Sequence, residues 1–321
     1  MLKALSVPIF RRRNANGSCL AFTSVLLIGI FLSVETTAQP NQNSQGVKRT
    51  TDVMYGRKAG MALTMDIFEP ATKNGAAVVF LVSGGWLSSH DDTTMVHVAP
   101  EYFVPYLSRG YTVFAVVHSS QPYFSIPDIV LDVQRAVRFI RHNAARYGVD
   151  RNRFGVLGSS SGGHLALMIA VQGGPGPVHA PDPIDRESSA VQSVACFFPP
   201  TDFLNWGAPG VDAVGRGPMS PLVSAFGTIS ATEPGRQLIG KLISPIYYVT
   251  ASLPPILIIH GDADTVVPLQ QSESFAAKAR QVGAPTVKII IRKGKGHGWA
   301  DFWKSQEDVE AFADWFDQHL K

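Results

Sequence analysis

Short, mostly apolar runs of residues recur along the chain, and more polar segments separate them. A run of this kind is typical of a strand buried on both faces, as in a parallel sheet. The clearest are AAVVFLVSGGW (76–86), which ends in glycines, and YTVFAVVHS (111–119), and the further segments are RFGVLG (153–158), VQSVACFF (191–198), PPILIIHG (254–261) and TVKIIIRKG (286–294). We therefore expect these segments to form strands in the interior of one sheet.

Helical periodicity marks several of the segments between these runs. The clearest is residues 127–147, where apolar residues recur every three or four positions and Gly148 follows as a stop. Further helices are expected at 162–171, 270–282 and 305–320. DVMYG (52–56) and MALTMDIFEP (61–70) predict an opening hairpin. Strands that alternate with helices indicate an α/β fold with a doubly wound, mostly parallel sheet.

The N-terminal segment, residues 1–38, has the pattern of a secretory signal peptide. Basic residues come first, an apolar stretch covers 19–34, and Thr36-Thr37-Ala38 supplies small residues for cleavage. The apolar stretch is shorter than the roughly 20 residues that a membrane span needs. We expect cleavage and a secreted or periplasmic location, with no stable membrane partner after export. An uncleaved segment that tethers the protein to the membrane is the alternative.

The remainder divides into a short linker and one large domain. Residues 39–51 are polar and aperiodic, which predicts a linker. Residues 52–321 carry all the strand and helix patterns and form the expected catalytic domain. Within it, residues 203–243 are rich in Gly and Pro and only weakly periodic. This insertion is a candidate lid, and the alternative is an ordinary surface loop.

Charge and cysteine content narrow the class of protein. The formal net charge is +3, but residues 1–38 carry four basic and one acidic side chain, so the rest is formally neutral. A nucleic-acid-binding face needs clustered Lys and Arg, which the domain lacks. After cleavage only Cys196 remains, so an internal disulfide is excluded. Its apolar neighbours predict a buried, inert thiol.

Candidate chemistry centres on GSSSGGHLA, residues 158–166, where a predicted strand runs into a predicted helix. A turn this sharp strains the residue at its apex and accepts only small residues two positions before and after it. Only Ser160 has glycine at both positions, Gly158 and Gly162. We therefore predict Ser160 as a nucleophile at the start of a helix. The backbone N–H of Ser161 would then face a developing oxyanion.

Two later loops supply partners for a serine nucleophile. A serine hydroxyl needs an imidazole to accept its proton, and that imidazole needs a carboxylate to fix its tautomer. Asp262 and Asp264 follow one predicted strand, and His297 lies between glycines after another. The order Ser, Asp, His at strand ends is the order of the α/β-hydrolase triad.

The combined motifs resemble α/β-hydrolases of the esterase/lipase group, including acetyl-xylan and feruloyl esterases and hormone-sensitive-lipase-like enzymes. The resemblance rests on GSSSGGHLAL, DVQRAVRFIRHNAARYGVDRNRFGVLG, SPIYYV, PPILIIHGDADTVVP and GHGW, and covers roughly Asp52 to the C-terminus. It implies that Asp264 is the catalytic acid, that Asp262 holds the loop and that His297 is the base.

The loop after the first buried strand departs from the family pattern. The family has His-Gly-Gly-Gly or His-Gly-Gly-x-Trp, whereas this chain has LVSGGWLSS, with Val82 in the place of the histidine. The resemblance implies Gly84 and Gly85 as backbone donors to the oxyanion. Trp86 is a candidate substrate-binding residue that would stack on a sugar or acyl group, and a core position is the alternative.

The remaining histidines have structural interpretations. We expect His260 to be a core residue and His164 to pack beneath the turn at Ser160. His118 lies at a strand end and is a weaker candidate for lining a pocket, whereas His90 is expected in a loop or at the surface. No group of His, Cys, Asp and Glu has metal-ligand spacing, and no phosphate-binding glycine loop occurs, so we expect no metal and no cofactor.

These features together predict a secreted serine carboxylesterase that acts on short-chain acyl esters through an acyl-enzyme. The substrate would be a small-molecule ester or an acetylated or feruloylated polysaccharide. Two alternatives stay open, a prolyl-oligopeptidase-like exopeptidase and a non-catalytic binding protein on a hydrolase scaffold. The sequence leaves the oligomeric state undetermined.

Overall fold

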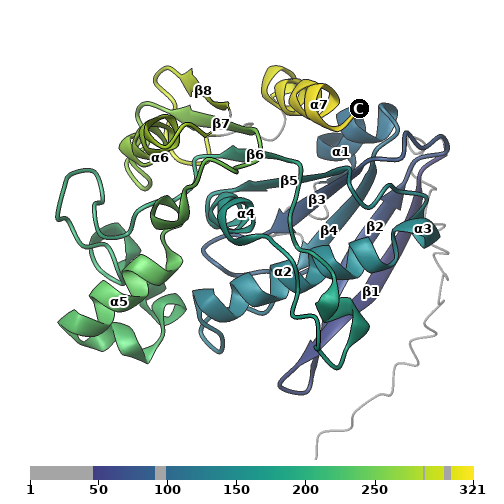
Figure 1. The fold of residues 1–321 in the computed structure, drawn as a ribbon. Helices are drawn as coiled ribbons and strands as arrows, with labels where there is room; N and C mark the ends of the chain where they lie inside the picture. Colours follow the sequence, from purple (N-terminus) through teal and green to yellow (C-terminus); the bar gives the residue numbers. More distant parts are fainter. Residues whose placement is uncertain (1–45, 91–98, 285, 300–304) are drawn as a thin grey trace, which may run out of the picture. The chain divides into compact units, whose positions relative to one another are not determined.

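The computed structural model describes residues 46–90, 99–284, 286–299 and 305–321. Within them, eight strands form one sheet in the order β1-β2-β4-β3-β5-β6-β7-β8 (Figure 1). The strands are β1 (Lys48–Lys58), β2 (Met61–Glu69), β3 (Ala77–Val82), β4 (Thr112–Val117), β5 (Phe154–Ser159), β6 (Ser193–Phe197), β7 (Ile256–Gly261) and β8 (Val287–Arg292). From β4 to β8 all neighbours pair in parallel, which confirms the predicted doubly wound sheet.

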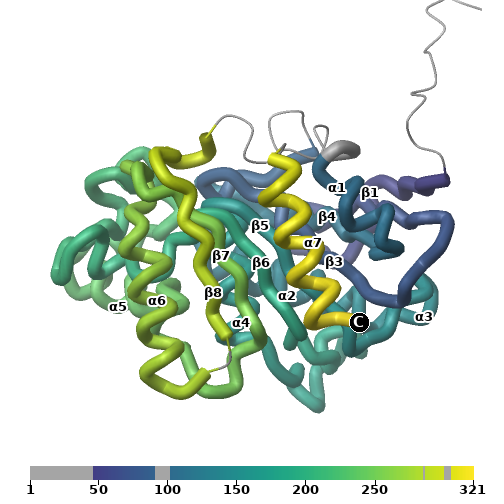
Figure 2. Tube along the Cα trace, turned by 90° about the horizontal axis from the view of Figure 1, so that it is seen from above, coloured from purple at the N-terminus to yellow at the C-terminus, as the bar shows by residue number. Residues whose placement is uncertain are grey.

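Helices cover both faces of this sheet. They are α1 (Ala99–Ser108), α2 (Ile126–His142), α3 (Ala144–Tyr147), α4 (Ser161–Gln172), α5 (Glu233–Ile243), α6 (Gln270–Gln281) and α7 (Gln306–Leu320). The α1 and α7 helices pack on one face, and α2 and α4 pack on the other (Figures 1 and 2).

The β3 strand shows why its residues are all apolar. Val79 and Leu81 belong to the core on the α2 and α4 side, whereas Val78 and Phe80 belong to the core under α1 and α7. Successive side chains of a strand point to opposite faces, so a strand covered on both faces reads as a continuous apolar run. The prediction from the hydrophobic pattern is therefore confirmed.

The sheet opens with the predicted antiparallel hairpin of β1 and β2. The turn residues Ala59 and Gly60 both have positive φ, 48° and 80°, as a type I′ hairpin turn requires. The first strand starts at Lys48, so the predicted linker 39–51 is wrong in its last four residues. Residues 48–51 are polar because they lie at the exposed edge of the sheet, which sequence polarity alone did not distinguish from a linker.

The predicted insertion 203–243 lies between β6 and β7 and is largely helical. It contains the short 3-10 helices η3 (Gly217–Phe226) and η4 (Thr228–Ala231) followed by α5, and η5 (Pro245–Tyr248) comes after it. Another 3-10 turn, η2 (Pro183–Arg186), precedes β6. Phe203, Met219 and Phe226 are buried in the same core as α4. The inner face of the insertion is thus packed, and motion as a lid stays a prediction.

The predicted signal peptide, residues 1–38, lies outside the described residues, as do residues 39–45 of the predicted linker. Among the helices that the structure does describe, none is long and apolar enough to cross a membrane.

Cys196 lies fully buried in β6, and burial raises the pKa of its thiol well above the usual range. The expectation of a buried cysteine is confirmed.

Candidate active site

The turn between β5 and α4 has the strained geometry that the glycine spacing predicts. Ser160 lies at its apex with φ 52° and ψ −119°, a conformation that non-glycine residues rarely adopt. A Cβ on Gly158 would lie 2.4 Å from the backbone of Gly162, and a Cβ on Gly162 would lie 2.7 Å from Leu81 O. Both glycines are therefore required sterically. The turn is held by a 3.0 Å bond from the Ser160 N–H to Phe197 O.

The three residues predicted as a triad meet in one hydrogen-bonded series. Ser160 Oγ lies 2.9 Å from Nε2 of His297, and Nδ1 of His297 lies 2.8 Å from Oδ2 of Asp264. Asp264 follows β7 and His297 follows β8, so strands of one parallel sheet deliver all three at the same edge. A carboxylate only accepts, so Nδ1 carries the proton and Nε2 is free to accept from the serine hydroxyl.

The Asp264 carboxylate is held in its ionised form. Burial by itself raises the pKa of Asp264, but hydrogen bonds from His260 and His297 outweigh it and hold the pKa well below the usual range. Oδ1 also accepts the backbone N–H groups of Val266 and Val267, at 2.9 and 2.8 Å. Asp262 has a separate role: its Oδ1 accepts the Gly294 N–H at 2.6 Å and joins the two loops.

The loop after β3 corrects the predicted pair of oxyanion donors. Gly85 and Trp86 both have φ of 58°, and the Leu87 N–H bonds to Gly84 O at 3.1 Å, as in a type I′ turn. The Gly84 N–H is itself bonded to Leu87 O at 3.0 Å, so Gly84 is not available as a donor. Within the described residues, the N–H groups of Gly85 and Ser161 have no hydrogen-bond partner.

Polar contacts support this loop where the family has a histidine. Ser83 Oγ lies 3.0 Å from Ser161 Oγ, which links the loop directly to the turn at the nucleophile. Gln121 donates its backbone N–H to Trp86 O at 3.2 Å and its side-chain amide to Gly85 O at 3.3 Å. Sequence reasoning missed Gln121 because nothing in its local pattern indicates a contact with residues more than thirty positions earlier.

The prediction that Trp86 binds substrate is contradicted by its burial. Its side chain is 1% exposed, and its ring packs against His164, Phe203 and Phe226. Its Nε1 donates to Nδ1 of His164 at 3.3 Å. An indole that fills the space between α4 and the insertion buries a large apolar surface, which favours the core position over a solvent-facing one.

Both histidines that were expected to be structural are fully buried. His164 lies on α4, where Nε2 donates to Ile243 O at 2.7 Å, and burial lowers its pKa to about 4. His260 lies in β7 and contacts Ser272 Oγ at 2.7 Å and Val267 O at 2.8 Å. Its Nε2 also lies 3.3 Å from Oδ2 of Asp264. A core histidine therefore contacts the catalytic carboxylate, which its position in the sequence did not predict.

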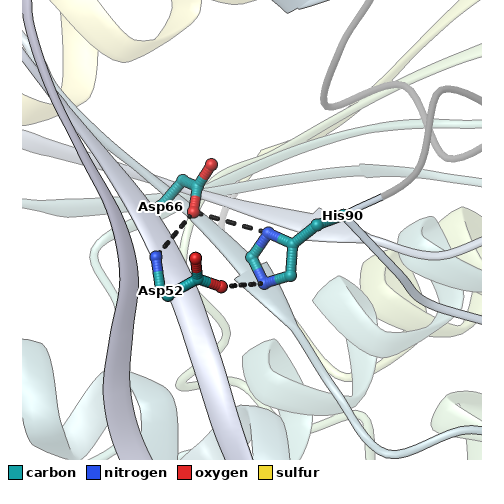
Figure 3. A group of neighbouring side chains, drawn as sticks. All are labelled: Asp52, Asp66 and His90. Carbon is teal, nitrogen blue, oxygen red and sulfur yellow. Dashed lines mark hydrogen bonds and ion pairs between the residues drawn. The ribbon is translucent and has the colours of Figure 1, made fainter. Parts of the chain in front are cut away.

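Among the residues that the structure describes, one group of potential metal ligands occurs outside this site. Asp52, Asp66 and His90 lie together although they are distant in sequence, so spacing could not predict the group (Figure 3). Nδ1 of His90 faces Asp66 at 3.4 Å, and Nε2 faces Asp52 at 3.6 Å. Arg49 already pairs with Asp66 at 2.6 Å. Nε2 of His90 also lies 2.8 Å from Thr64 Oγ1, so both ring nitrogens already have protein partners and do not converge with the carboxylates on one point.

The parallel sheet, the strained serine turn and the Ser-Asp-His order define an α/β-hydrolase of the esterase/lipase group. The chain belongs to the BD-FAE family, whose model matches residues 65–279.

Among curated proteins, the chain is 30% identical over 287 residues to esterase LipQ of Mycobacterium tuberculosis (strain ATCC 25618 / H37Rv), which covers 86% of this chain and 63% of that protein. It thus spans about six tenths of the length of the first curated relatives it matches.

Among solved structures, a truncated carbohydrate esterase from gut microbiota has a TM-score of 0.69 and 28% identity, covering 84% of this chain and 95% of that one. Thermogutta terrifontis esterase 2, phosphonylated by sarin, has a TM-score of 0.65 and 25% identity, covering 87% and 96%.

Proposed function

We propose that this protein is a secreted serine esterase that hydrolyses short-chain acyl esters through an acyl-enzyme. The observation that carries the proposal is the hydrogen-bonded series from Ser160 through His297 to Asp264. Two backbone N–H groups without partners, those of Gly85 and Ser161, lie in the two segments that the Ser83–Ser161 contact joins. A nucleophile, a base, an orienting acid and an oxyanion hole are the parts that acyl transfer requires.

The first half of the reaction forms the acyl-enzyme. Ser160 Oγ attacks the ester carbonyl carbon while Nε2 of His297 takes the hydroxyl proton. Negative charge develops on the carbonyl oxygen, and the N–H groups of Ser161 and Gly85 stabilise it. The Asp264 carboxylate stabilises the imidazolium that forms. His297 then protonates the alkoxide as the C–O bond breaks, and the alcohol leaves.

The second half regenerates the enzyme. A water molecule attacks the acyl carbonyl, and Nε2 of His297 takes a proton from it. The same two N–H groups stabilise the second oxyanion. His297 then returns the proton to Ser160 Oγ, and the carboxylic acid leaves.

The substrate class and the location extend the proposal further. The carbohydrate esterase among the solved structures supports an ester of a sugar or polysaccharide. The pattern of residues 1–38 supports export and cleavage after Ala38. Mass measurement of the protein recovered from the culture medium or periplasm would test the location: a chain that retains residues 1–38 contradicts cleavage.

Hydrolysis of 4-nitrophenyl acetate, butyrate and octanoate by the protein and by Ser160→Ala tests the chemistry. We expect activity that falls with acyl length, and a loss on the order of a million-fold in the variant, as for other dissected serine triads. Equal activity in Ser160→Ala would refute the assignment. Absence of activity on every ester, together with no labelling by a fluorophosphonate, would favour a binding protein on a hydrolase scaffold.

A further inference from the structure

The turn that presents the Gly85 N–H is strained and needs support from outside itself. Gly85 and Trp86 both have φ of 58°, and the left-handed region is unfavourable for a bulky residue such as Trp86. A residue stays in this region only where its surroundings hold it there. If the turn relaxed, the bond from the Leu87 N–H to Gly84 O would break. Because the N–H and C=O of a trans peptide point in opposite directions, any rotation that moves Gly84 O also redirects the Gly85 N–H.

One short segment of the insertion packs against this turn. The η3 segment carries Leu222, Ser224 and Phe226 at alternate positions. A Cβ on Gly85 would lie 3.1 Å from Cδ2 of Leu222, so the leucine side chain packs directly on Gly85. The Phe226 ring lies edge to face with the Trp86 ring, with centroids 5.9 Å apart. The insertion therefore encloses both central residues of the strained turn.

A polar relay runs from the same segment to the turn, from Ser224 through Gln121 to Gly85. The side-chain amide of Gln121 donates from Nε2 to Gly85 O at 3.3 Å, and its Oε1 accepts from the Ser224 hydroxyl. A backbone carbonyl only accepts, so Nε2 must face Gly85 O and Oε1 must face Ser224. The backbone N–H of Gln121 donates to Trp86 O at 3.2 Å. Gln121 thus holds the carbonyl groups of both central residues of the turn.

The Ser224 hydroxyl fixes the orientation of the Gln121 amide. The terminal torsion of a glutamine side chain has broad minima, so its hydrogen-bond partners decide which way the amide turns. Gln121 is a buried residue, and Ser224 is partly buried. Removal of the serine hydroxyl takes the donor away from Oε1. The amide is then no longer held with Nε2 toward Gly85 O.

We propose that Ser224 of the insertion is a positioning residue for catalysis. Through Gln121 it holds the turn at Gly85 and Trp86 in the conformation that presents the Gly85 N–H to the oxyanion. The inference rests on the proposed esterase function and adds a role for the insertion in the chemical step. The effect falls on transition-state stabilisation, because the oxyanion exists only there and in the tetrahedral intermediates.

The test uses substitutions at two serines of η3 and at the glutamine. Ser224→Ala removes the hydroxyl donor, and Ser224→Thr retains it. Ser220→Ala makes the same chemical change at an exposed position of the same segment and is the matched control. Gln121→Met removes the amide but keeps an unbranched side chain of similar length and the backbone N–H. Urea unfolding of every variant checks that it folds.

A trifluoromethyl ketone measures oxyanion stabilisation directly. Its carbonyl carbon bonds to Ser160 Oγ, Nε2 of His297 takes the hydroxyl proton, and the carbonyl oxygen becomes an oxyanion. We expect Ser224→Ala to raise the inhibition constant and to lower kcat/KM for 4-nitrophenyl acetate by the same factor, about fivefold, the effect of one hydrogen bond. Loss of a whole oxyanion donor costs about 100–1000-fold in kcat, so a displaced donor should cost less.

The remaining variants show whether Ser224 acts through Gln121. Ser224→Thr, which keeps the hydrogen bond, should stay within about twofold of the wild type, and Ser220→Ala should match the wild type. In the Gln121→Met background, Ser224→Ala should have no further effect on the inhibition constant. Additive effects of the two substitutions, or an unchanged inhibition constant in a folded Ser224→Ala protein, would overturn the inference.

Hydrogen exchange at the Leu87 amide separates this inference from the esterase proposal. The Leu87 N–H bonds to Gly84 O across the turn, so its exchange rate measures how often the turn opens. We expect faster exchange in Ser224→Ala than in Ser220→Ala, even if the wild type hydrolyses no ester. Equal exchange in the two variants contradicts the inference whatever the activity. A wild type that neither hydrolyses esters nor binds the ketone contradicts the esterase function instead.

Discussion

Replacement of His260 tests whether a fully buried residue positions the catalytic carboxylate. Oδ1 of Asp264 accepts two backbone N–H groups, whereas Oδ2 accepts from His297 at 2.8 Å and faces Nε2 of His260 at 3.3 Å. His260→Asn removes the Nε2 donor, and His260→Gln retains one near that position.

The magnitude follows from the strength of the lost interaction. A hydrogen bond to a charged group contributes about 1.5–3 kcal/mol, and the long, shared bond from His260 belongs at the lower end. About 1.4 kcal/mol of lost transition-state stabilisation corresponds to a tenfold lower kcat. The asparagine variant should therefore lose about tenfold in kcat, with KM little changed, and the glutamine variant should recover most of it.

The pH dependence separates positioning from a loss of folding. The His260 hydrogen bond lowers the pKa of Asp264, so its removal raises that pKa, and the carboxylate protonates at a higher pH in the variant. A ¹³C NMR titration of the Asp264 carboxyl should show this rise in pKa in His260→Asn and not in His260→Gln. Urea unfolding at neutral pH measures the separate stability cost. A folded His260→Asn protein with unchanged kcat and an unchanged pKa of Asp264 would refute the reasoning.

Two further predictions follow from buried side chains. Trp86→Ala should lower the free energy of unfolding by about 3–5 kcal/mol because it leaves a cavity between α4 and the insertion; a variant of normal stability in urea, with weakened substrate binding, would instead favour the original binding role. Burial lowers the pKa of both His118 and His164 from 6.5 to about 4. Stability is therefore complete above about pH 6.5 and falls as the pH drops toward 4, by on the order of 3 kcal/mol per histidine. Urea unfolding at pH 7.5 and 4.5 measures the fall, and His164→Gln should reduce it; an equal fall in that variant would contradict the assignment.

Local patterns in the sequence predicted the elements and the nucleophile. The apolar runs predicted the buried strands because burial on both faces leaves no polar position in such a strand. Gly158 and Gly162 predicted Ser160 as the apex because the steric demand of the turn acts within five residues. Strand-end positions predicted His297 and one of Asp262 and Asp264, since the ends of parallel strands meet at one edge of the sheet, and the family resemblance selected Asp264.

Only the tertiary structure decided which backbone and side-chain groups face the site and which are buried or hydrogen-bonded to other residues. The Gly84 N–H donates to Leu87 O within the turn and is therefore not available to a substrate. Trp86 is buried because α4 and the insertion enclose it. Contacts of Gln121 with Gly85 and of His260 with Asp264 depend on how the elements pack. The sequence by itself thus determined the order of the elements and the position of Ser160 at the turn, because both follow from local periodicity and turn sterics. The tertiary structure decided which backbone N–H groups of the loop are already bonded and that Trp86 is buried, because hydrogen-bond partners and enclosure come from residues far apart in the chain.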